Sequence, residues 1–259
     1  MVCPKKPKQK SILVCWNAKQ LIKDNFFFHF FFIFILSDTM AKLNGKSIPE
    51  KEKPELIYVY DPLCGWCYGF SPVITRLKDQ MNSDVDFLVL SGGMVREAGP
   101  IGEIAGYIKT AYKLVEDTTG VKFGEKFLNE ILNNGEAIFT SVPPAKALAV
   151  LRIHLPEKCV EIAARLQKAF YHDGIQVDDY SAYAQIAKEF GMDPDEFLLK
   201  VKSPEIAEIV ENEFKMAAGL GVKGYPTTVL RRGKETQILT RGYKDFDSLY
   251  KIVKDAILH

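Results

Sequence analysis

The sequence predicts an α/β fold in which a small sheet is flanked by helices and interrupted by a long helical block. Two continuous apolar runs, residues 56–60 and 85–90, are typical of strands that are covered on both faces. Nearly every segment from residue 100 to about 201 has helical periodicity. Strand patterns return only at residues 226–239, so the sheet is assembled from both ends of the block.

The first strand leads directly into a helix-like stretch, residues 67–80. Its apolar residues are spaced as on one helix face, and Pro72 is expected to kink the helix. The second strand ends at the sequence Ser91-Gly92-Gly93. The two strands are thus expected in a sheet that is flanked by helices.

The helical block consists of several segments that each carry an apolar stripe. They cover residues 101–116, 123–132, 143–153, 157–171 and 180–190. Gly191 is a suitable C-terminal stop, and Asp193 before Pro194 predicts the start of another helix. A further helix is expected at residues 204–218.

A hairpin and one helix complete the predicted fold. Residues 226–230 and 236–239 have strand character, and Gly233 lies in the turn that joins them. Residues 245–258 carry apolar side chains on one helical face.

Two cysteines lie between the first strand and the first helix, in the sequence Cys64-Gly65-Trp66-Cys67. Cysteines with this spacing in this position form a redox-active dithiol. The N-terminus of a helix carries partial positive charge, which favours a thiolate on Cys64. The thiolate is the form that attacks a disulfide, and Cys67, one turn further on, can resolve the resulting mixed disulfide.

These motifs resemble those of the DsbA-like disulfide oxidoreductases, which have a thioredoxin fold with a large all-helical insertion domain. Residues 61–72 read D-P-L-C-G-W-C-Y-G-F-S-P, similar to the D-P-x-C-x-W-C-x-G-F-x-P pattern of the predicted protein-disulfide isomerase branch. Pro72 also stands where thioredoxins have a helix-kinking proline. Residues 222–227, V-K-G-Y-P-T, resemble the V-x-G-x-P-T loop whose proline is cis in this family.

The resemblance extends over about residues 55–258 and implies a division of the chain. Residues 55–98 and 203–259 would form the two parts of the thioredoxin domain, and residues 99–202 the helical insertion. Residues 1–54 would be an N-terminal extension.

The resemblance also implies roles for individual residues. Cys64 would be the nucleophile and Cys67 the resolving thiol. Trp66, Tyr225 and Pro226 would bind the substrate, with the backbone of the Tyr225–Pro226 loop facing the dithiol and pairing with an extended peptide. The substrate would be a thiol or disulfide in a peptide, a protein or glutathione. A redox partner would recycle the dithiol, and no cofactor would be tightly bound, although glutathione could act as a co-substrate.

Three of these residues have simpler interpretations that remain open. Asp61 is a candidate proton relay, but it could equally be a turn residue before a proline. Trp66 forms an apolar wall beside the dithiol or packs against the helical block. Pro226 could be an ordinary trans proline at the start of a strand.

The remaining cysteines and histidines give weaker signals. A C-x-x-C pair can be half of a zinc site, but such a site needs two more ligands, and Cys159, His154 and His172 form no second pair with suitable spacing. Cys159 lies on the apolar stripe of its helix and is expected to be a buried core thiol. The two histidines are expected at the surface or at helix ends.

Three function classes follow. The first is a thiol-disulfide oxidoreductase or isomerase whose direction of electron flow is open. Because Gly65-Trp66 supplies no charge between the cysteines, we expect its dithiol to be less oxidising than that of DsbA. The second is a glutathione-dependent isomerase or a kappa-like glutathione transferase, which would not need Cys67. The third is a redox-inert peptide-binding module.

Composition argues against two other classes, nucleic-acid-binding proteins and small disulfide-stapled proteins. The chain has 34 basic and 33 acidic residues and a net charge of +1, which gives no electrostatic basis for binding nucleic acid. Five cysteines in 259 residues are too few for a small disulfide-stapled fold.

The first 39 residues differ from the rest of the chain. Residues 26–36 are an apolar, Phe-rich run, too short to span a bilayer as a helix, which needs roughly 20 residues. The run could be a signal or anchor, or translation could start at Met40, and we expect residues 1–39 to be dispensable for folding and activity. We therefore expect a cytoplasmic enzyme without a membrane partner; a genuine signal or anchor would place it in the periplasm or on a membrane.

Overall fold

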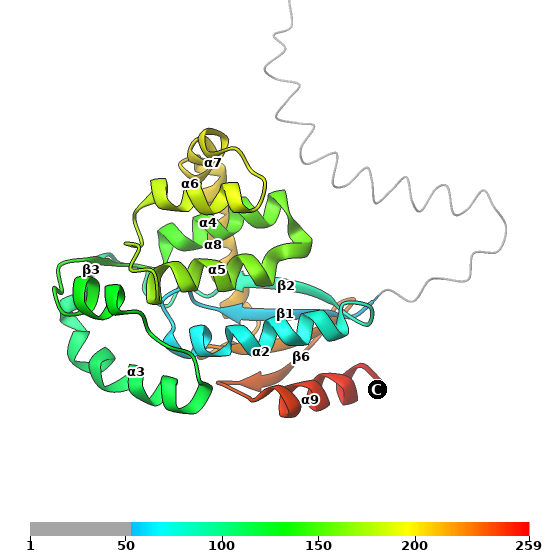
Figure 1. The fold of residues 1–259 in the computed structure, drawn as a ribbon. Helices are drawn as coiled ribbons and strands as arrows, with labels where there is room; N and C mark the ends of the chain where they lie inside the picture. Colours follow the sequence, from blue (N-terminus) through cyan, green and yellow to red (C-terminus); the bar gives the residue numbers. More distant parts are fainter. Residues whose placement is uncertain (1–52, 259) are drawn as a thin grey trace, which may run out of the picture. The chain divides into compact units, whose positions relative to one another are not determined.

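The computed structural model describes residues 53–258, which lie in one compact unit (Figure 1). Its main sheet has four strands in the order β2-β1-β5-β6. These strands are β1 (Glu55–Tyr60), β2 (Asp86–Ser91), β5 (Thr227–Arg232) and β6 (Glu235–Arg241). β1 pairs in parallel with β2 and antiparallel with β5, so the two halves predicted from the sequence meet along the central strand.

Eight helices of regular α-type lie in the described residues. They are α2 (Gly65–Met81), α3 (Ala105–Thr119), α4 (Val142–His154), α5 (Cys159–Tyr171), α6 (Tyr180–Glu189), α7 (Pro194–Val201), α8 (Pro204–Gly219) and α9 (Phe246–Leu258). Short 3-10 turns cover Ile101–Glu103 and Pro156–Lys158. Most boundaries agree with the sequence predictions within a few residues because caps and prolines mark the helix starts. The Asp193 carboxylate, for example, accepts the N–H groups of Asp195 and Glu196, both at 3.0 Å.

The block between residues 99 and 202 differs from the prediction at two points. The segment expected to be a short helix at 123–132 is a π-helix over Phe127–Leu132. In addition, β3 (Gly99–Pro100) and β4 (Ile138–Phe139) form a small antiparallel sheet. Two-residue strands carry no periodic pattern, so the prediction of an entirely helical block was wrong here.

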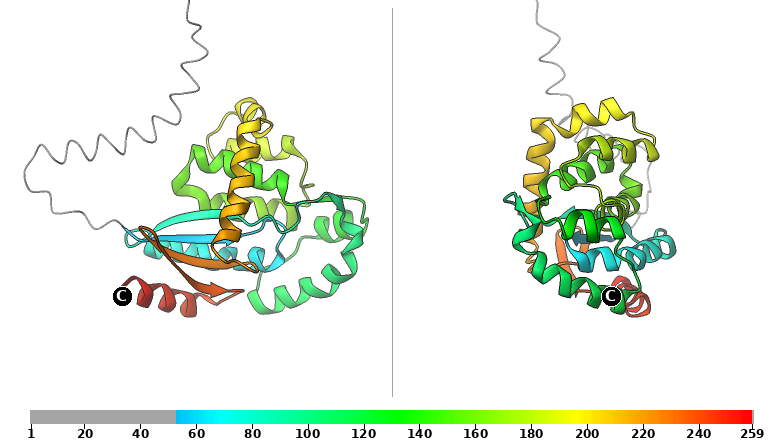
Figure 2. Two further views of the ribbon diagram at one scale, coloured as in Figure 1. Left: turned by 180° about the vertical axis from the view of Figure 1, so that it is seen from behind. Right: turned by 60° about the vertical axis from the view of Figure 1, so that its left-hand side comes forward.

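Alternation along β1 distributes its side chains between two cores. Leu56, Tyr58 and Tyr60 pack with the buried face of α2 and with the helices of the block. Ile57 and Val59 face the opposite side, where Ala217 near the end of α8 contributes to a separate apolar cluster. Seen from behind, α8 runs from the helical block down to the sheet (Figure 2).

The helical block and the sheet share one continuous core, which includes Leu148, Leu166 and Phe197 of the block together with the first face of β1. α5 packs on α2, and α8 contacts both α4 and β2. The division at residues 98 and 202 therefore remains a prediction.

No helix within residues 53–258 is both long enough and apolar enough to cross a membrane. The predictions about the Phe-rich run at 26–36 and about Met40 lie outside the described residues.

Candidate active site

The first turn of α2 holds both cysteines of the motif, and both are free thiols. Cys64 is the N-cap residue, and its sulfur accepts the N–H of Cys67 at 3.3 Å. The Cys64 N–H donates to the Asp61 carbonyl at 3.0 Å, which closes the turn between β1 and α2. The Cys64 sulfur thus occupies the position at which helix N–H groups stabilise negative charge.

The two thiols differ in burial. Cys64 is 7% exposed, whereas Cys67 is fully buried. Burial, and then the neighbouring Cys64, raise the pKa of Cys67 well above its ordinary value. Burial likewise raises the pKa of Cys159 to about 11. Among the thiols that the structure describes, Cys64 is therefore the one placed to react with a molecule from solvent.

The loop between α8 and β5 faces Cys64. Its Tyr225–Pro226 peptide bond is cis. The Cys64 thiol donates to the Tyr225 carbonyl with a sulfur–oxygen distance of 3.6 Å. The Tyr225 hydroxyl donates to the Gly92 carbonyl at 2.9 Å, which fixes the ring over the end of β2. The structure thus brings together the dithiol and the loop, which are 161 residues apart in the chain.

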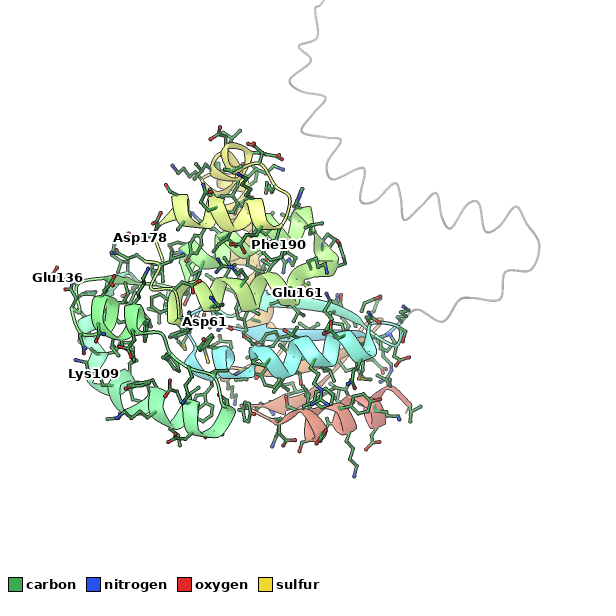
Figure 3. All side chains as sticks on the ribbon, viewed as in Figure 1. Asp61, Lys109, Glu136, Glu161, Asp178 and Phe190 are labelled. Carbon is green, nitrogen blue, oxygen red and sulfur yellow. The ribbon has the colours of Figure 1, made fainter. Side chains whose placement is uncertain are left out.

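Asp61 lies where the sheet meets the helical block (Figure 3). It is fully buried, and its carboxylate accepts hydrogen bonds from the Leu63 N–H at 2.9 Å, the Ser141 hydroxyl at 2.8 Å and the Met94 N–H at 2.7 Å. Burial raises the pKa of Asp61, and these donors oppose the rise. The bond to Leu63 is that of a turn residue. The proton-relay role stays a prediction.

Helix α5 holds the backbone of the dithiol loop through two side chains that the sequence analysis missed. The Gln167 amide donates to the carbonyls of Asp61 at 3.1 Å and Cys64 at 3.4 Å. Its oxygen accepts the Ser71 hydroxyl at 3.0 Å, and the Tyr171 hydroxyl donates to the Leu63 carbonyl. The available signal was a glutamine on the otherwise apolar stripe of this helix, because a buried amide needs polar partners.

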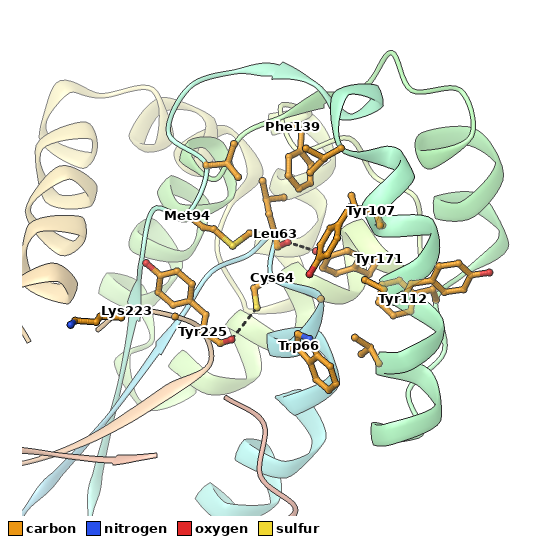
Figure 4. A pocket seen from close by; sticks show the side chains of 18 residues that line it. Leu63, Cys64, Trp66, Met94, Tyr107, Tyr112, Phe139, Tyr171, Lys223 and Tyr225 are labelled. Atoms are coloured by element: carbon orange, nitrogen blue, oxygen red, sulfur yellow. Dashed lines mark hydrogen bonds between the residues drawn. The ribbon is translucent and has the colours of Figure 1, made fainter. Parts of the chain in front are cut away.

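A cavity of about 390 Å³ opens beside Cys64 (Figure 4). Its walls come from the dithiol loop, from α3 and from the loop around Tyr225, with Phe139 and Tyr171 also contributing. Lys223 is the single charged residue among those that line it. The site is therefore suited to an apolar group next to the reactive sulfur.

Trp66 lines this cavity and also packs into the core. Its ring lies 6.2 Å from the ring of Tyr243, between centroids. It contacts the cluster of the helical block as well, so both interpretations made from the sequence hold.

The remaining cysteine and histidine predictions are confirmed. Cys159 is 1% exposed, and its thiol donates to the Phe87 carbonyl at 3.4 Å. His154 is exposed at the end of α4. His172 caps the C-terminus of α5, with its Nδ1 2.9 Å from an Asp173 carboxylate oxygen.

The model of the DSBA-like thioredoxin domain matches residues 127–254, a range that includes the Tyr225–Pro226 loop but not the two cysteines of α2. No curated protein matches the sequence significantly.

Several solved structures share the fold. A provisionally named protein disulfide isomerase from Nitrosomonas europaea is similar with a TM-score of 0.71 and 24% identity, over 80% of this chain and 98% of that one. The cytosolic disulfide reductase DsbM from Pseudomonas aeruginosa is similar with a TM-score of 0.66 and 25% identity, over 79% and 98% of the two chains. DsbM has also been solved with GSH. A 2-hydroxychromene-2-carboxylate isomerase is similar with a TM-score of 0.54 and 15% identity, over 78% and 94%. These likenesses confirm a thioredoxin fold with a helical insertion.

Proposed function

Because the model of the DSBA-like thioredoxin domain matches residues 127–254, we propose that the chain is a thiol-disulfide oxidoreductase whose dithiol is Cys64 and Cys67. The observation that carries the proposal is the asymmetry of the pair. The Cys64 sulfur caps α2 at the edge of a cavity, whereas Cys67 is fully buried behind it. A pair of this kind supplies an attacking thiolate and an internal resolving thiol.

The reaction proceeds in two exchanges. The Cys64 thiolate attacks a substrate disulfide, and one substrate sulfur leaves with the electron pair of the broken bond and takes up a proton. Cys67 then loses its proton and attacks the Cys64 sulfur, which breaks the mixed disulfide and releases the second substrate thiol. The enzyme is left as the Cys64–Cys67 disulfide, and an external thiol must reduce it; the same steps in reverse oxidise a dithiol.

The similarity to the disulfide reductase DsbM supports the reducing direction and a cytoplasmic location. The structure of DsbM with GSH supports glutathione as the thiol that recycles the dithiol. The apolar cavity supports a substrate that places an apolar group beside the disulfide, with Trp66 and Tyr225, which line it, in contact with that group. Pro226 is buried and does not line the cavity, so its proposed part in binding is through the loop that it shares with Tyr225. Asp61 remains a candidate proton relay within this scheme.

Alkylation and redox equilibration test the proposal. At about neutral pH, iodoacetamide should modify Cys64 before Cys67 and Cys159, because burial raises the pKa of both other thiols. Peptide mapping by mass spectrometry identifies the site. In glutathione buffers the pair should titrate as a two-electron couple between about −270 and −120 mV. Earlier labelling of Cys67 or Cys159, or the absence of any thiol–disulfide equilibrium, would count against the dithiol and favour a redox-inert module.

Replacing Gly92 with alanine should displace the substrate loop. A Cβ at Gly92 would lie 2.0 Å from a carbon of the Tyr225 ring, so the ring must move. We expect the Tyr225 backbone carbonyl beside Cys64 to shift with it. Misplacement of a positioning group by about 1 Å can cost on the order of 100-fold, and we expect reduction of a peptide disulfide to slow by about 10- to 100-fold.

Gly106→Ala is the matched control, because a Cβ at Gly106 would meet no atom within 4 Å. Its turnover should equal that of the unaltered protein. If Gly92→Ala also turned over normally, the Tyr225 loop could not be a positioning element.

A further inference from the structure

Tyr58 has a buried hydroxyl that makes no hydrogen bond within residues 53–258. The side chain is 1% exposed, and its oxygen has no hydrogen-bond partner among the described residues. Buried hydroxyls are normally paired, because an unpaired one loses its bonds to water without replacement. An unpaired buried hydroxyl therefore calls for a physical explanation, which depends on what lies around it.

The orphaned hydroxyl lies beneath the dithiol. Tyr58 is on the face of β1 that packs with α2, in the same buried cluster as Cys67 and Phe70. Its ring is 5.6 Å from the ring of Phe70, which follows Cys67 by one helical turn. Burial is the largest cause of the raised pKa of Tyr58, and the charges of Cys67 and then of Cys64 are the next largest. Tyr58 and Cys67 thus belong to one buried cluster, in which β1 packs under the first turn of α2.

Cys67 needs a hydrogen-bond donor on the side of β1 only during the second exchange, when it becomes a thiolate. It is fully buried, so its thiolate is poorly stabilised when it forms. The carboxylate of Asp61 is engaged by Leu63, Ser141 and Met94, none of which is part of the dithiol. The Tyr60 hydroxyl also has no hydrogen-bond partner among the described residues. Burial is the main cause of its raised pKa, and the charges of Asp61 and Glu213 raise that pKa more than the charge of Cys67 does.

We propose that the Tyr58 hydroxyl donates a hydrogen bond to the Cys67 sulfur as that sulfur loses its proton, and so speeds the release of substrate from Cys64. The inference rests on the proposed oxidoreductase function. Cys67 forms its bond with the Cys64 sulfur while the bond from Cys64 to the substrate sulfur breaks. The substrate sulfur leaves with that electron pair and receives the proton from Cys67, and Tyr58 keeps its own proton throughout.

The resting structure agrees with this role. A protonated thiol is a weak acceptor, so the hydroxyl gains little from Cys67 until the thiolate develops. A hydrogen bond to an ionised group is stronger than one between neutral groups, so the interaction favours the reacting state over the resting one.

Ellman's reagent separates the two exchanges, because it releases one coloured thiolate when Cys64 attacks and a second when Cys67 resolves the mixed disulfide. The full chain is used with Cys3→Ser and Cys15→Ser, so that these two thiols give no signal. In Tyr58→Phe we expect the first phase to be unchanged and the second to slow by about tenfold, the loss expected from one hydrogen bond to a charged group. The melting temperature should not fall, because phenylalanine removes an unpaired hydroxyl and keeps the ring.

Tyr183→Phe is the matched control. Tyr183 is also 1% exposed, and its hydroxyl also has no hydrogen-bond partner in the part of the chain that the structure describes, but it lies on α6. Both of its phases should match the unaltered protein. A normal second phase in Tyr58→Phe, equal slowing of both phases, or equal slowing in Tyr183→Phe would each overturn the inference. If the unaltered protein showed no second phase at all, the dithiol mechanism itself would be wrong.

Discussion

A Cys67→Ser variant is expected to accumulate a stable mixed disulfide between Cys64 and its substrate and to lose nearly all multiple turnover. The serine hydroxyl cannot attack the Cys64 sulfur, so the intermediate persists until an external thiol releases it. Cys64→Ser should trap nothing, because Cys67 is fully buried and cannot reach a disulfide in solution. Non-reducing electrophoresis and intact-mass measurement after incubation with a peptide disulfide distinguish these outcomes.

Cys159→Ser provides the control, because its thiol is buried and donates to the Phe87 carbonyl of β2 rather than to the dithiol. It should neither trap substrate nor slow exchange. A Cys67→Ser variant that retained full turnover would instead favour the single-cysteine chemistry of a glutathione-dependent isomerase or a kappa-like transferase.

An Arg152→Met variant is expected to lose about 3–5 kcal/mol of stability, the typical cost of leaving one partner of a buried ion pair alone. The Arg152 guanidinium on α4 donates to the Val89 carbonyl and to the Glu213 carboxylate on α8. The Glu213 carboxylate also accepts the Ser91 N–H at 3.3 Å, so the pair joins two helices to β2. The two side chains are only 13% and 5% exposed, and the melting temperature should fall by about 10 °C.

The destabilisation should depend on pH. Burial raises the pKa of Glu213, and Arg152 is the main influence that lowers it. Without Arg152 the folded-state pKa rises further above the unfolded one, so stability is retained at low pH and is lost as the pH rises through the folded-state value. The defect of Arg152→Met relative to the unaltered protein should therefore shrink as the pH is lowered from about 8 towards about 5.

Two further variants make this test specific. Glu213→Leu added to Arg152→Met should recover much of the lost stability, because no unpaired charge then remains buried. Lys200→Met removes an ion pair to Glu196 in which both side chains are 48% exposed, and it should cost less than about 1 kcal/mol. A loss in Arg152→Met as small as that in Lys200→Met would show that the buried pair contributes no more than a surface one.

The helices, the strands and the position of the dithiol can be predicted from the amino-acid sequence, because their signals are local. The apolar run at 56–60 followed by two cysteines is sufficient to place Cys64 at a helix N-terminus, and the structure has Cys64 as the N-cap. Asp193 before Pro194 likewise predicted a helix start that the structure contains. Such signals lie within a few residues of the feature that they specify, so they do not depend on how the chain folds back on itself.

The residues that surround the dithiol become known only from the folded chain, because they are distant from it in the sequence. The periodicity of α5 predicts a buried face, but not that Gln167 on this face reaches the carbonyls of Asp61 and Cys64 across more than 100 residues. The same holds for the orphaned hydroxyl of Tyr58, which in the sequence is one apolar position in a buried strand. Periodicity identifies which side chains turn inward, whereas the pairing of buried polar groups depends on which elements pack together, and that is settled only when the whole core forms.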